Sequence, residues 1–403
     1  MSDTPWLTIV GLGEDALDGL PPASRQALAD AKFIMGAARH VALLPDLDAE
    51  IITWPVPFSE GIAQLLDRGG EPVVMLASGD PFWHGAGAVL ARHIPPSEWR
   101  ALPAPSCMSL AAASLGWPLE TTLTFGLHAA RFSQLKPHLF PKSRIIITLR
   151  DGDAVAQCAD WLVSEGFGAS NLHVLEALGG PRERIRHIMA ADMLSDMALT
   201  DIQHPVVLAI EVAGEGAVIP LASGRPDDIF ENDGQITKRP IRALTLSALA
   251  PRPHEYLWDI GGGSGSIGLE WLWAHPTMRA TSVEIDATRA ERIRDNARRL
   301  GLERLNVVTG DAPDALTWLD TPDAVFIGGG ISHQMLDTVW DRLPDRGRLV
   351  ANGVTLEAEV LLAEWHAEKG GSLMRIELAQ SKPLGRKRGW KSSYPIVQWS
   401  VTK

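Results

Sequence analysis

Short apolar runs alternate with longer amphipathic stretches along most of the chain. Runs rich in Val, Ile and Leu predict strands at residues 7–10, 73–77, 145–149, 172–176 and 206–211. Helical spacing of apolar positions predicts helices at residues 61–68, 109–115 and 155–166. Residues 213–234 are rich in Gly, Pro and Asp and keep no period, which predicts a linker or the opening loop of a second domain.

The second half of the chain alternates more regularly. An apolar strand at residues 256–260 leads into a glycine-rich turn and a helix that reaches Trp273. Apolar residues recur at helical spacing from Ala290 to Leu300, and Gly301 follows where a helix would end. Further strands are predicted at residues 280–285, 305–309, 324–327, 347–351, 373–378 and 394–401. Such alternation is typical of a parallel, doubly wound sheet, so the predicted fold class is α/β.

The glycine-rich turn in "LWDIGGGSGSIGLEW" fits two cofactors. Gly263, Gly265 and Gly268 spell the dinucleotide motif G-x-G-x-x-G, whereas Asp259, Gly261, Gly263 and Gly265 spell D-x-G-x-G-x-G, which suits S-adenosylmethionine. In an open α/β sheet the ligand lies beyond the carboxyl ends of the strands. Both cofactors need backbone that can approach closely, so the glycines alone do not choose between them.

Residues outside the glycines favour S-adenosylmethionine over NAD. Asp259 would repel a pyrophosphate but suits a cationic sulfonium or amino group. Glu284 or Asp286, after the second strand, can bind ribose hydroxyls, and Asp311 with the backbone of Ala312 can read an adenine. Residues 328–330, "GGG", leave space for a substrate, and no arrangement suited to hydride transfer is evident. The predicted contacts in this half are Asp259, Gly261, Gly262, Gly263, Ser264, Gly265, Glu284, Asp311 and Ala312.

Composition narrows the class of protein. The chain has 403 residues, enough for two or three domains, and 37 Lys and Arg against 49 Asp and Glu, a net charge of −12 that argues against a nucleic-acid partner. Its two cysteines, Cys107 and Cys158, form no metal-binding spacing, so neither a metal site nor a disulfide framework is expected. No apolar run approaches the ~20 residues of a membrane span, and a cytoplasmic enzyme is expected.

The second half resembles the decarboxylating precorrin methyltransferases of cobalamin biosynthesis. Besides the glycine turn, "SVEID", "GDAPDAL" and "GGG", it carries the leader "GRPDDIFENDGQITKRPIRALTLSAL", which generic methyltransferases lack. The resemblance implies that this leader lies over the cofactor and that Thr237 contacts it.

The first half resembles the tetrapyrrole methylase family. The resemblance rests on "IVGLGED", "ASGDPFWHGAG", "PAPSCMSLAAASLGWPLE" and "VLEALGGPRERI". It implies a two-lobed α/β domain that holds S-adenosylmethionine between its lobes, with Gly79, Asp80 and Ser106 at the cofactor. Two departures from the family pattern concern this site: Glu14 and Asp15 replace a common Pro-Gly, and Ala129 stands where a glycine is expected.

Together the resemblances imply a two-lobed tetrapyrrole methylase domain at residues 1–222 followed by a doubly wound class I (Rossmann-like) methyltransferase domain at residues 223–403. The implied reaction methylates precorrin-6B at carbons 5 and 15, with loss of carbon dioxide from the carbon-12 acetate, to give precorrin-8X. The cofactor supplies the electrophile, so no catalytic side chain is singled out.

Such a tetrapyrrole carries many carboxylates and needs cationic partners. The predicted substrate contacts are Arg386, Arg388 and Lys391 before the last strand, Arg239 and His128. Both families also imply a homo-oligomer, a dimer or a tetramer. Two other hypotheses stay open: a methyltransferase acting on RNA, and one active domain joined to a non-catalytic tetrapyrrole-binding domain.

Overall fold

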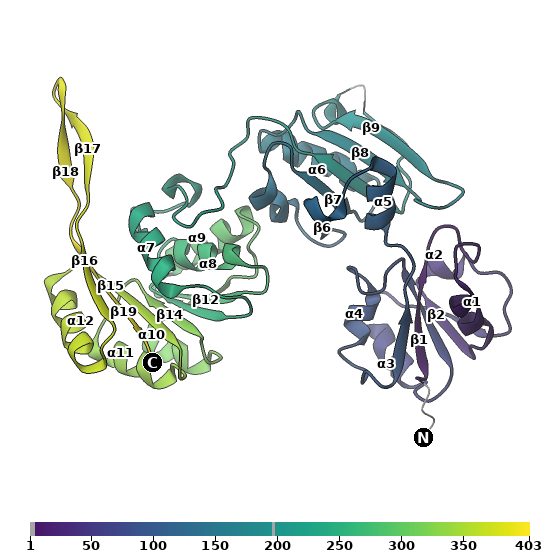
Figure 1. Cartoon of the computed structure of the whole chain (residues 1–403), viewed down its shortest axis with the longest axis horizontal. Coiled ribbons are helices and arrows are strands. Elements are labelled where there is room, and N and C mark those ends of the chain that lie inside the picture. Colours follow the sequence, from purple (N-terminus) through teal and green to yellow (C-terminus); the bar gives the residue numbers. More distant parts are fainter. Residues whose placement is uncertain (1–4, 196–197) are drawn as a thin grey trace. The chain divides into compact units, whose positions relative to one another are not determined.

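The computed structural model describes residues 5–195 and 198–403. The chain divides into two compact units (Figure 1). Unit 1 takes Met1–Phe132 and His138–Ala217, and unit 2 takes Ser133–Pro137 and Val218–Lys403.

The first part of unit 1, here called the N-lobe, is a parallel five-stranded sheet in the order β3-β2-β4-β1-β5. Its strands are β1 (Leu7–Leu12), β2 (Phe33–Gly36), β3 (Glu50–Thr53), β4 (Val73–Ser78) and β5 (Trp99–Leu102). Its helices are α1 (Pro22–Ala29), α2 (Ala38–Val41), α3 (Glu60–Leu66) and α4 (Ala86–Leu90). Every residue of β1 is buried, as expected of a strand covered on both faces.

The second part of unit 1, the C-lobe, has a mixed sheet in the order β6-β7-β10-β8-β9. Its strands are β6 (Thr122–Gly126), β7 (Arg144–Thr148), β8 (Asn171–Glu176), β9 (Arg184–Met189) and β10 (Val206–Glu211). The C-lobe also contains α5 (Cys107–Leu115), α6 (Asp153–Ser164) and the 3-10 turns η1 (Leu119–Thr121) and η3 (Asp192–Leu194). The 3-10 turn η2 (Phe132–His138) has its two end residues in unit 1 and residues Ser133–Pro137 in unit 2. Only β6 and β7 pair in parallel, and the other neighbours are antiparallel.

Unit 2 has a seven-stranded sheet in the order β13-β12-β11-β14-β15-β19-β16. Its strands are β11 (Tyr256–Ile260), β12 (Arg279–Glu284), β13 (Asn306–Thr309), β14 (Ala324–Ile327), β15 (Arg348–Gly353), β16 (Ser372–Ile376) and β19 (Ile396–Thr402). Its helices are α7 (Arg239–Leu249), α8 (Ser266–Ala274), α9 (Ala287–Arg299), α10 (Ala312–Ala315), α11 (His333–Arg342) and α12 (Leu356–Lys369), with the 3-10 turns η4 (Asp227–Ile229) and η5 (Leu316–Trp318).

The strand order of unit 2 reverses between β11 and β14, which places the ligand crevice of a doubly wound sheet at their carboxyl ends. The α/β fold class predicted from the sequence is confirmed. The sheet is not wholly parallel, however, because β19 pairs antiparallel with both β15 and β16.

A separate two-stranded hairpin, here called the arm, consists of β17 (Ala379–Leu384) and β18 (Lys387–Ser392). It projects from the ends of β16 and β19 (Figure 1). Since β16 and β15 are both antiparallel to β19, they run in the same direction, and the chain leaves β16 at the carboxyl edge of the sheet. The arm therefore starts at the edge where the ligand crevice lies.

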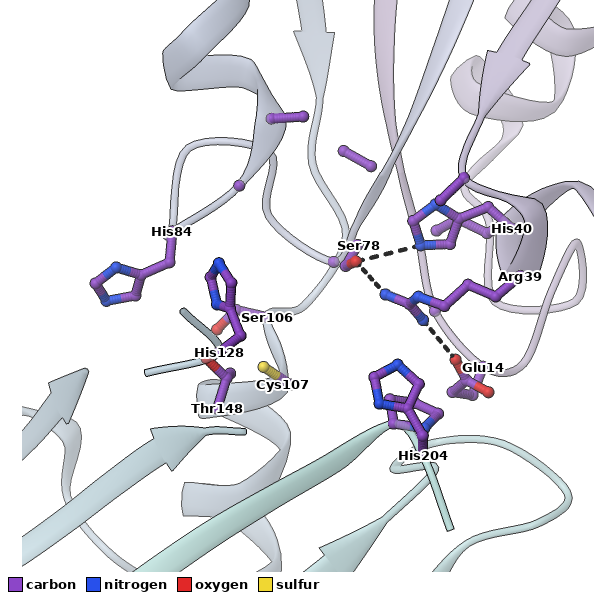
Figure 2. A pocket seen from close by; sticks show the side chains of 18 of the residues that line it. Glu14, Arg39, His40, Ser78, His84, Ser106, Cys107, His128, Thr148 and His204 are labelled. Carbon is purple, nitrogen blue, oxygen red and sulfur yellow. Dashed lines mark hydrogen bonds and ion pairs between the residues drawn. The ribbon is translucent and has the colours of Figure 1, made fainter. Parts of the chain in front are cut away.

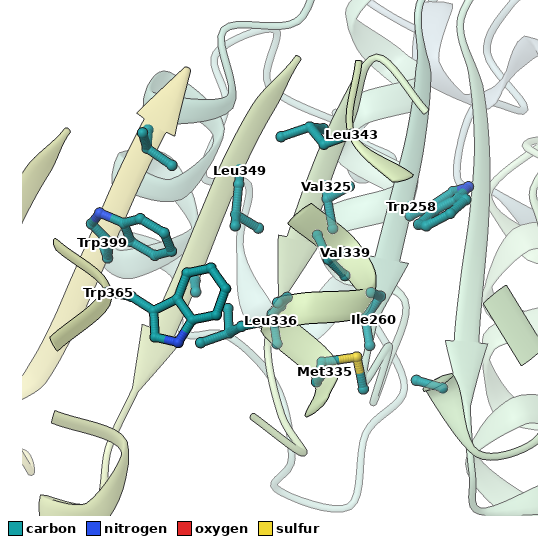
Figure 3. Close-up of a cluster of buried hydrophobic side chains, with 14 of the residues drawn as sticks. Trp258, Ile260, Val325, Met335, Leu336, Val339, Leu343, Leu349, Trp365 and Trp399 are labelled. Carbon is teal, nitrogen blue, oxygen red and sulfur yellow. The ribbon is translucent and has the colours of Figure 1, made fainter. Parts of the chain in front are cut away.

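The core of unit 2 packs aromatic and aliphatic side chains between the sheet and α11 and α12 (Figure 3). Trp258 on β11 and Trp399 on β19 are fully buried, and Trp365 of α12 packs against Trp399 with ring centroids 6.0 Å apart. Met335 and Val339 of α11 belong to the same cluster. Burial of each such side chain contributes roughly 1.5–3 kcal/mol, so this layer holds the strands that carry the crevice in place.

The stretch at residues 213–234, predicted to be a linker or opening loop, contains no strand or α-helix, only η4. It is nevertheless packed: Ile219 and Phe230 belong to the core of unit 2, and the Arg225 side chain is buried. The prediction of a loop is confirmed, and the loop is anchored to the core of unit 2 through these buried side chains. Within residues 5–195 and 198–403, no helix is long and apolar enough to span a membrane.

Candidate functional site

The turn between β11 and α8 lies at the carboxyl end of the central strand. Gly261, Gly263 and Gly265 have φ angles of 71°, 60° and 75°, a region that side chains disfavour. A Cβ on Gly261 would also lie 2.8 Å from the backbone nitrogen of Gly329, in the loop after β14. The glycines therefore let the loops after β11 and β14 approach each other at the crevice.

Glu284, at the end of β12, is the acidic residue that faces this turn. Its carboxylate accepts hydrogen bonds from the backbone N–H groups of Gly263 (2.8 Å) and Asp286 (3.0 Å). Asp286 instead caps α9, since its Oδ1 accepts from the N–H groups of Thr288 and Arg289. Of the two alternatives left open by the sequence, the structure places Glu284 at the turn.

Asp259, at the end of β11, is buried beneath the turn. Its side chain is only 1% exposed, and Oδ2 accepts hydrogen bonds from Ser282 Oγ (2.7 Å) and Gly268 N (3.1 Å). Burial raises the pKa of its carboxyl group to about 6. The carboxylate ties β11 to α8 and β12, and the ligand contact expected from the sequence stays a prediction. The absence of a side chain at Gly268 leaves room for the Asp259 carboxylate, because a Cβ there would lie 3.0 Å from Oδ2.

The remaining predicted contacts of unit 2 cluster around the turn. Ser264 is buried, and its Oγ has no hydrogen-bond partner among the described residues. Asp311 is exposed and begins α10 just before the buried Ala312. It lies at the same edge as Glu284, since Glu284 pairs with Thr309 across β12 and β13. Gly262 approaches the Cδ1 atom of Ile293, and a Cβ there would lie 2.9 Å away.

The leader reaches the turn through a residue that sequence reasoning missed. A Cβ on Gly263 would lie 3.1 Å from the carbonyl oxygen of Gln235. Thr237 is two residues further along, and its carbonyl accepts a hydrogen bond from Arg242. Gln235 carried no signal in the sequence, because it is a polar residue in an exposed loop.

Unit 1 contains a cavity of about 600 Å³ lined by residues of both lobes (Figure 2). Gly79, with φ of 49°, lines it, and a Cβ there would lie 2.7 Å from the carbonyl oxygen of Pro105. Ser106 also lines it and caps α5 by accepting from Ser109 N (3.0 Å). Asp80 is not among the lining residues, and its Oδ1 accepts a hydrogen bond from Phe82 N (2.8 Å) within the turn.

An ion-pair bridge joins the two lobes at Glu14, which lines this cavity. The Glu14 carboxylate, whose side chain is 11% exposed, pairs with Arg39 of the N-lobe and with Arg182 of the C-lobe, each at 3.0 Å. Glu14 thus gains two cationic partners where the family pattern has Pro-Gly. Ala129, the second departure, is exposed and is not part of the cavity lining.

Four histidines line the same cavity: His40, His84, His128 and His204 (Figure 2). Burial lowers the pKa of His40 to about 3, and burial also lowers the pKa values of His84 and His204. These three imidazoles are therefore neutral near pH 7. Arg39 and Arg150 are the arginines among the lining residues, and both are cationic at this pH.

The predicted substrate contacts do not all lie in one unit. Arg386 precedes β18 at the tip of the arm, and Arg388 and Lys391 lie on β18, where all three are exposed. Arg239 is exposed at the first position of α7, whereas His128 lines the cavity of unit 1. The sequence predicted no strand at residues 379–392, and the structure forms a hairpin there.

Both halves of the chain match protein families. Residues 6–193 match the tetrapyrrole (corrin/porphyrin) methylases, and residues 228–403 match the precorrin methyltransferase domain. A precorrin-6Y C(5,15)-methyltransferase [decarboxylating] from Sinorhizobium sp. is 48% identical over 99% of this chain and 97% of its own length. The chain belongs to the precorrin-6Y C(5,15)-methyltransferase (decarboxylating) family.

Other relatives agree with this membership. A protein of the same name from Mycobacterium tuberculosis is 39% identical over 98% of this chain and all of its own length. A cobalt-precorrin-6B C(15)-methyltransferase (decarboxylating) from Salmonella typhimurium is 28% identical over 42% of this chain and 91% of its own length. Membership in the precorrin-6Y C(5,15)-methyltransferase family confirms both resemblances seen in the sequence.

Proposed function

We propose that the chain methylates precorrin-6B at carbons 5 and 15 and removes carbon dioxide from the carbon-12 acetate, giving precorrin-8X, with S-adenosylmethionine as methyl donor at two sites. The observation that carries this proposal is that each unit has its own site: the glycine turn with Glu284 in unit 2, and the cavity with Gly79 and Ser106 in unit 1. We assign these sites to two domains, residues 1–222 and 223–403.

In unit 2 the donor set fits S-adenosylmethionine. Glu284 offers a carboxylate for ribose hydroxyls, as an acidic residue after the second strand does in related sheets. The unpartnered Ser264 Oγ is a buried polar atom that a ligand can satisfy. Backbone of Gly261 to Gly265 forms the floor, with Asp311 and Ala312 beyond it. The bound cofactor would supply a methyl group on a sulfonium, and the chain's part is to orient it and exclude water.

In unit 1 the cavity also has polar atoms that a ligand can satisfy. Thr148 Oγ1 and His40 Nδ1 are buried and have no hydrogen-bond partner among the described residues, and both residues line the cavity. Gly79 and Ser106 also line the cavity and are close neighbours, since a Cβ on Gly79 would lie 3.0 Å from Ser106 Cα. The cavity volume of about 600 Å³ falls within the usual range for small-molecule sites.

We assign carbon 15 and the decarboxylation to unit 2, and carbon 5 to unit 1. The support is that residues 228–403 match the precorrin methyltransferase domain, and that a shorter relative named for carbon 15 alone is decarboxylating. Residues 6–193 match the tetrapyrrole methylases, so we assign the remaining methylation, at carbon 5, to unit 1.

Cationic side chains would bind the substrate carboxylates. Arg386, Arg388 and Lys391 belong to the arm, which starts at the crevice edge of the sheet, and Arg239 opens α7 within the leader. His128 lines the cavity of unit 1. Arginine is suited to this task because its guanidinium binds a carboxylate through two parallel hydrogen bonds.

We also propose that the protein is a homo-oligomer, a dimer or a tetramer. The arm exposes Leu384 and Trp390, and Tyr394 follows it, with exposed fractions of 70%, 78% and 87%. An isolated two-stranded hairpin is marginally stable in water, so a covering surface is expected. Light scattering after gel filtration tests this, and a monomer at micromolar concentration would contradict it.

The experiment compares two variants of the full chain with precorrin-6B and isotope-labelled S-adenosylmethionine. In Gly263→Val the new side chain meets the Gln235 carbonyl at a φ of 60°, so methylation at carbon 15 and decarboxylation should stop while carbon 5 is still methylated. In Gly79→Ala the added Cβ meets the Pro105 carbonyl, and the reverse pattern is expected. If both methylations survive in Gly263→Val, the assignment of unit 2 is wrong.

A further inference from the structure

The part of the leader that precedes α7, residues 224–237, is fixed to unit 2 at its start by one carboxylate, and "leader" refers to this part below. Glu270 of α8 has a fully buried side chain. It accepts hydrogen bonds from the backbone N–H groups of Gly224 (2.7 Å) and Arg225 (2.9 Å) and from Arg242 Nε (2.6 Å). Arg242 in turn pairs with Asp227 at 3.0 Å. A buried carboxylate with this many donors fixes the backbone where the leader begins.

The leader is fixed again near its end. Asp233 pairs with Arg289 (2.9 Å) and Arg292 (3.1 Å) of α9, and its other oxygen accepts from Gln235 N (3.0 Å). These contacts set the position of Gln235, whose carbonyl faces Gly263.

Between these two anchors, one buried amide joins the leader to the glycine turn. Asn296 of α9 is fully buried. Its Oδ1 accepts from Glu231 N (2.9 Å), and its Nδ2 donates to Glu231 O (2.9 Å) and to Ser264 O (3.0 Å). Oδ1 also accepts from Arg299 (2.9 Å), so both donors and both acceptor sites of the amide are used.

We propose that Asn296 is a positioning residue for the cofactor site of unit 2: its amide sets the distance between the leader and the glycine turn before any ligand binds. The inference rests on the proposed function, since it takes this turn to hold S-adenosylmethionine. Preformed backbone lowers the ordering cost of binding, so loss of this link weakens cofactor binding more than it slows the chemical step.

The near-isosteric change Asn296→Asp tests the role of the amide. It replaces the two donors by an acceptor, so a carboxylate oxygen would face the carbonyl oxygens of Glu231 and Ser264 at hydrogen-bond distance. Those repelling contacts should separate the leader from the turn. For the full chain we expect KM for S-adenosylmethionine in the carbon-15 step to rise about tenfold or more, with kcat changed by less than about threefold.

Three controls accompany this variant. Methylation at carbon 5 in the same molecule should be unchanged. Trp271→Phe removes a partly buried hydrogen bond, from Trp271 Nε1 to Arg279 O (3.1 Å), at the opposite edge of the sheet, and should leave KM as in the wild type. Hydrogen exchange of the protein without ligand gives a readout apart from activity: amides of residues 228–237 should exchange faster in Asn296→Asp, and those of β14 should not.

Two results would overturn the positioning role. One is wild-type exchange of residues 228–237 together with wild-type KM in Asn296→Asp. The other is an equal rise of KM in Trp271→Phe, which would mean that general destabilisation explains the effect. Failure of the proposed function looks different: the wild type transfers no methyl group from S-adenosylmethionine, while faster leader exchange in Asn296→Asp still supports the link between leader and turn.

Discussion

The buried Asp259 gives a prediction about stability and pH. Its pKa is raised from 3.8 to about 6, chiefly by desolvation, so the folded protein holds a proton that the unfolded chain has released at intermediate pH. An acid with a raised folded-state pKa stabilises the fold fully below its unfolded pKa, and this stabilisation is lost as the pH rises through the folded pKa. Asp259 therefore destabilises unit 2 progressively between about pH 4 and pH 7.

The magnitude follows from these two pKa values. The extra proton on Asp259 adds about 1.4 kcal/mol to the free energy of unfolding at pH 5 and about zero at pH 8. Asp259→Asn keeps an oxygen that can accept from Ser282 and Gly268 but does not titrate. The free energy of unfolding of the Asn variant relative to the wild type should therefore rise by about 1.4 kcal/mol from pH 5 to pH 8.

The assay is urea denaturation at both pH values, with the unfolded fraction of each unit read by pulse proteolysis and mass spectrometry. The difference between the urea midpoints of variant and wild type should change by about 0.5 M in unit 2, for a slope of about 3 kcal/mol per molar urea. Peptides of unit 1 serve as the control and should show no change. If the urea midpoints of variant and wild type differ by the same amount at pH 5 and at pH 8, Asp259 is not a buried carboxyl group that titrates in this range.

Two further predictions concern charged groups of unit 2. Glu270→Gln leaves Arg242 without its buried counter-ion and should destabilise unit 2 by about 3–5 kcal/mol, which calorimetry would detect as a melting temperature lowered by about 6–20 °C; a change below about 1 kcal/mol would contradict the buried network. Alanine at Arg386, Arg388 and Lys391 together should raise KM for the tetrapyrrole roughly tenfold, less so at high salt, with KM for S-adenosylmethionine unchanged. An unchanged tetrapyrrole KM would remove the arm from the substrate site.

Much of the fold of unit 2 could be predicted, because its central strands are buried on both faces. The predicted strands at residues 256–260 and 324–327 match β11 and β14 residue for residue, since each apolar run ends at a turn signal. The arm could not be predicted in this way. Neither face of the arm is buried, so its sequence has no alternation of apolar and polar residues that would predict strands.

The candidate site was predictable in part for a related reason. The glycines and Glu284 lie beside strands that the sequence reveals, so their meeting at one edge follows from the parallel order of the sheet. The burial of Asp259 depends on Ser282 and Gly268, and that of Asn296 on the leader. Contacts between residues far apart in the chain leave no local pattern, and sequence reasoning missed them.

The most direct test of the account is the composition of the product. The full chain is incubated with precorrin-6B and S-adenosylmethionine carrying a labelled methyl group, and the product is weighed by mass spectrometry. The account predicts two labelled methyl groups gained and one carbon dioxide lost per molecule. A product with a single labelled methyl group, or with two and no loss of carbon dioxide, would contradict it.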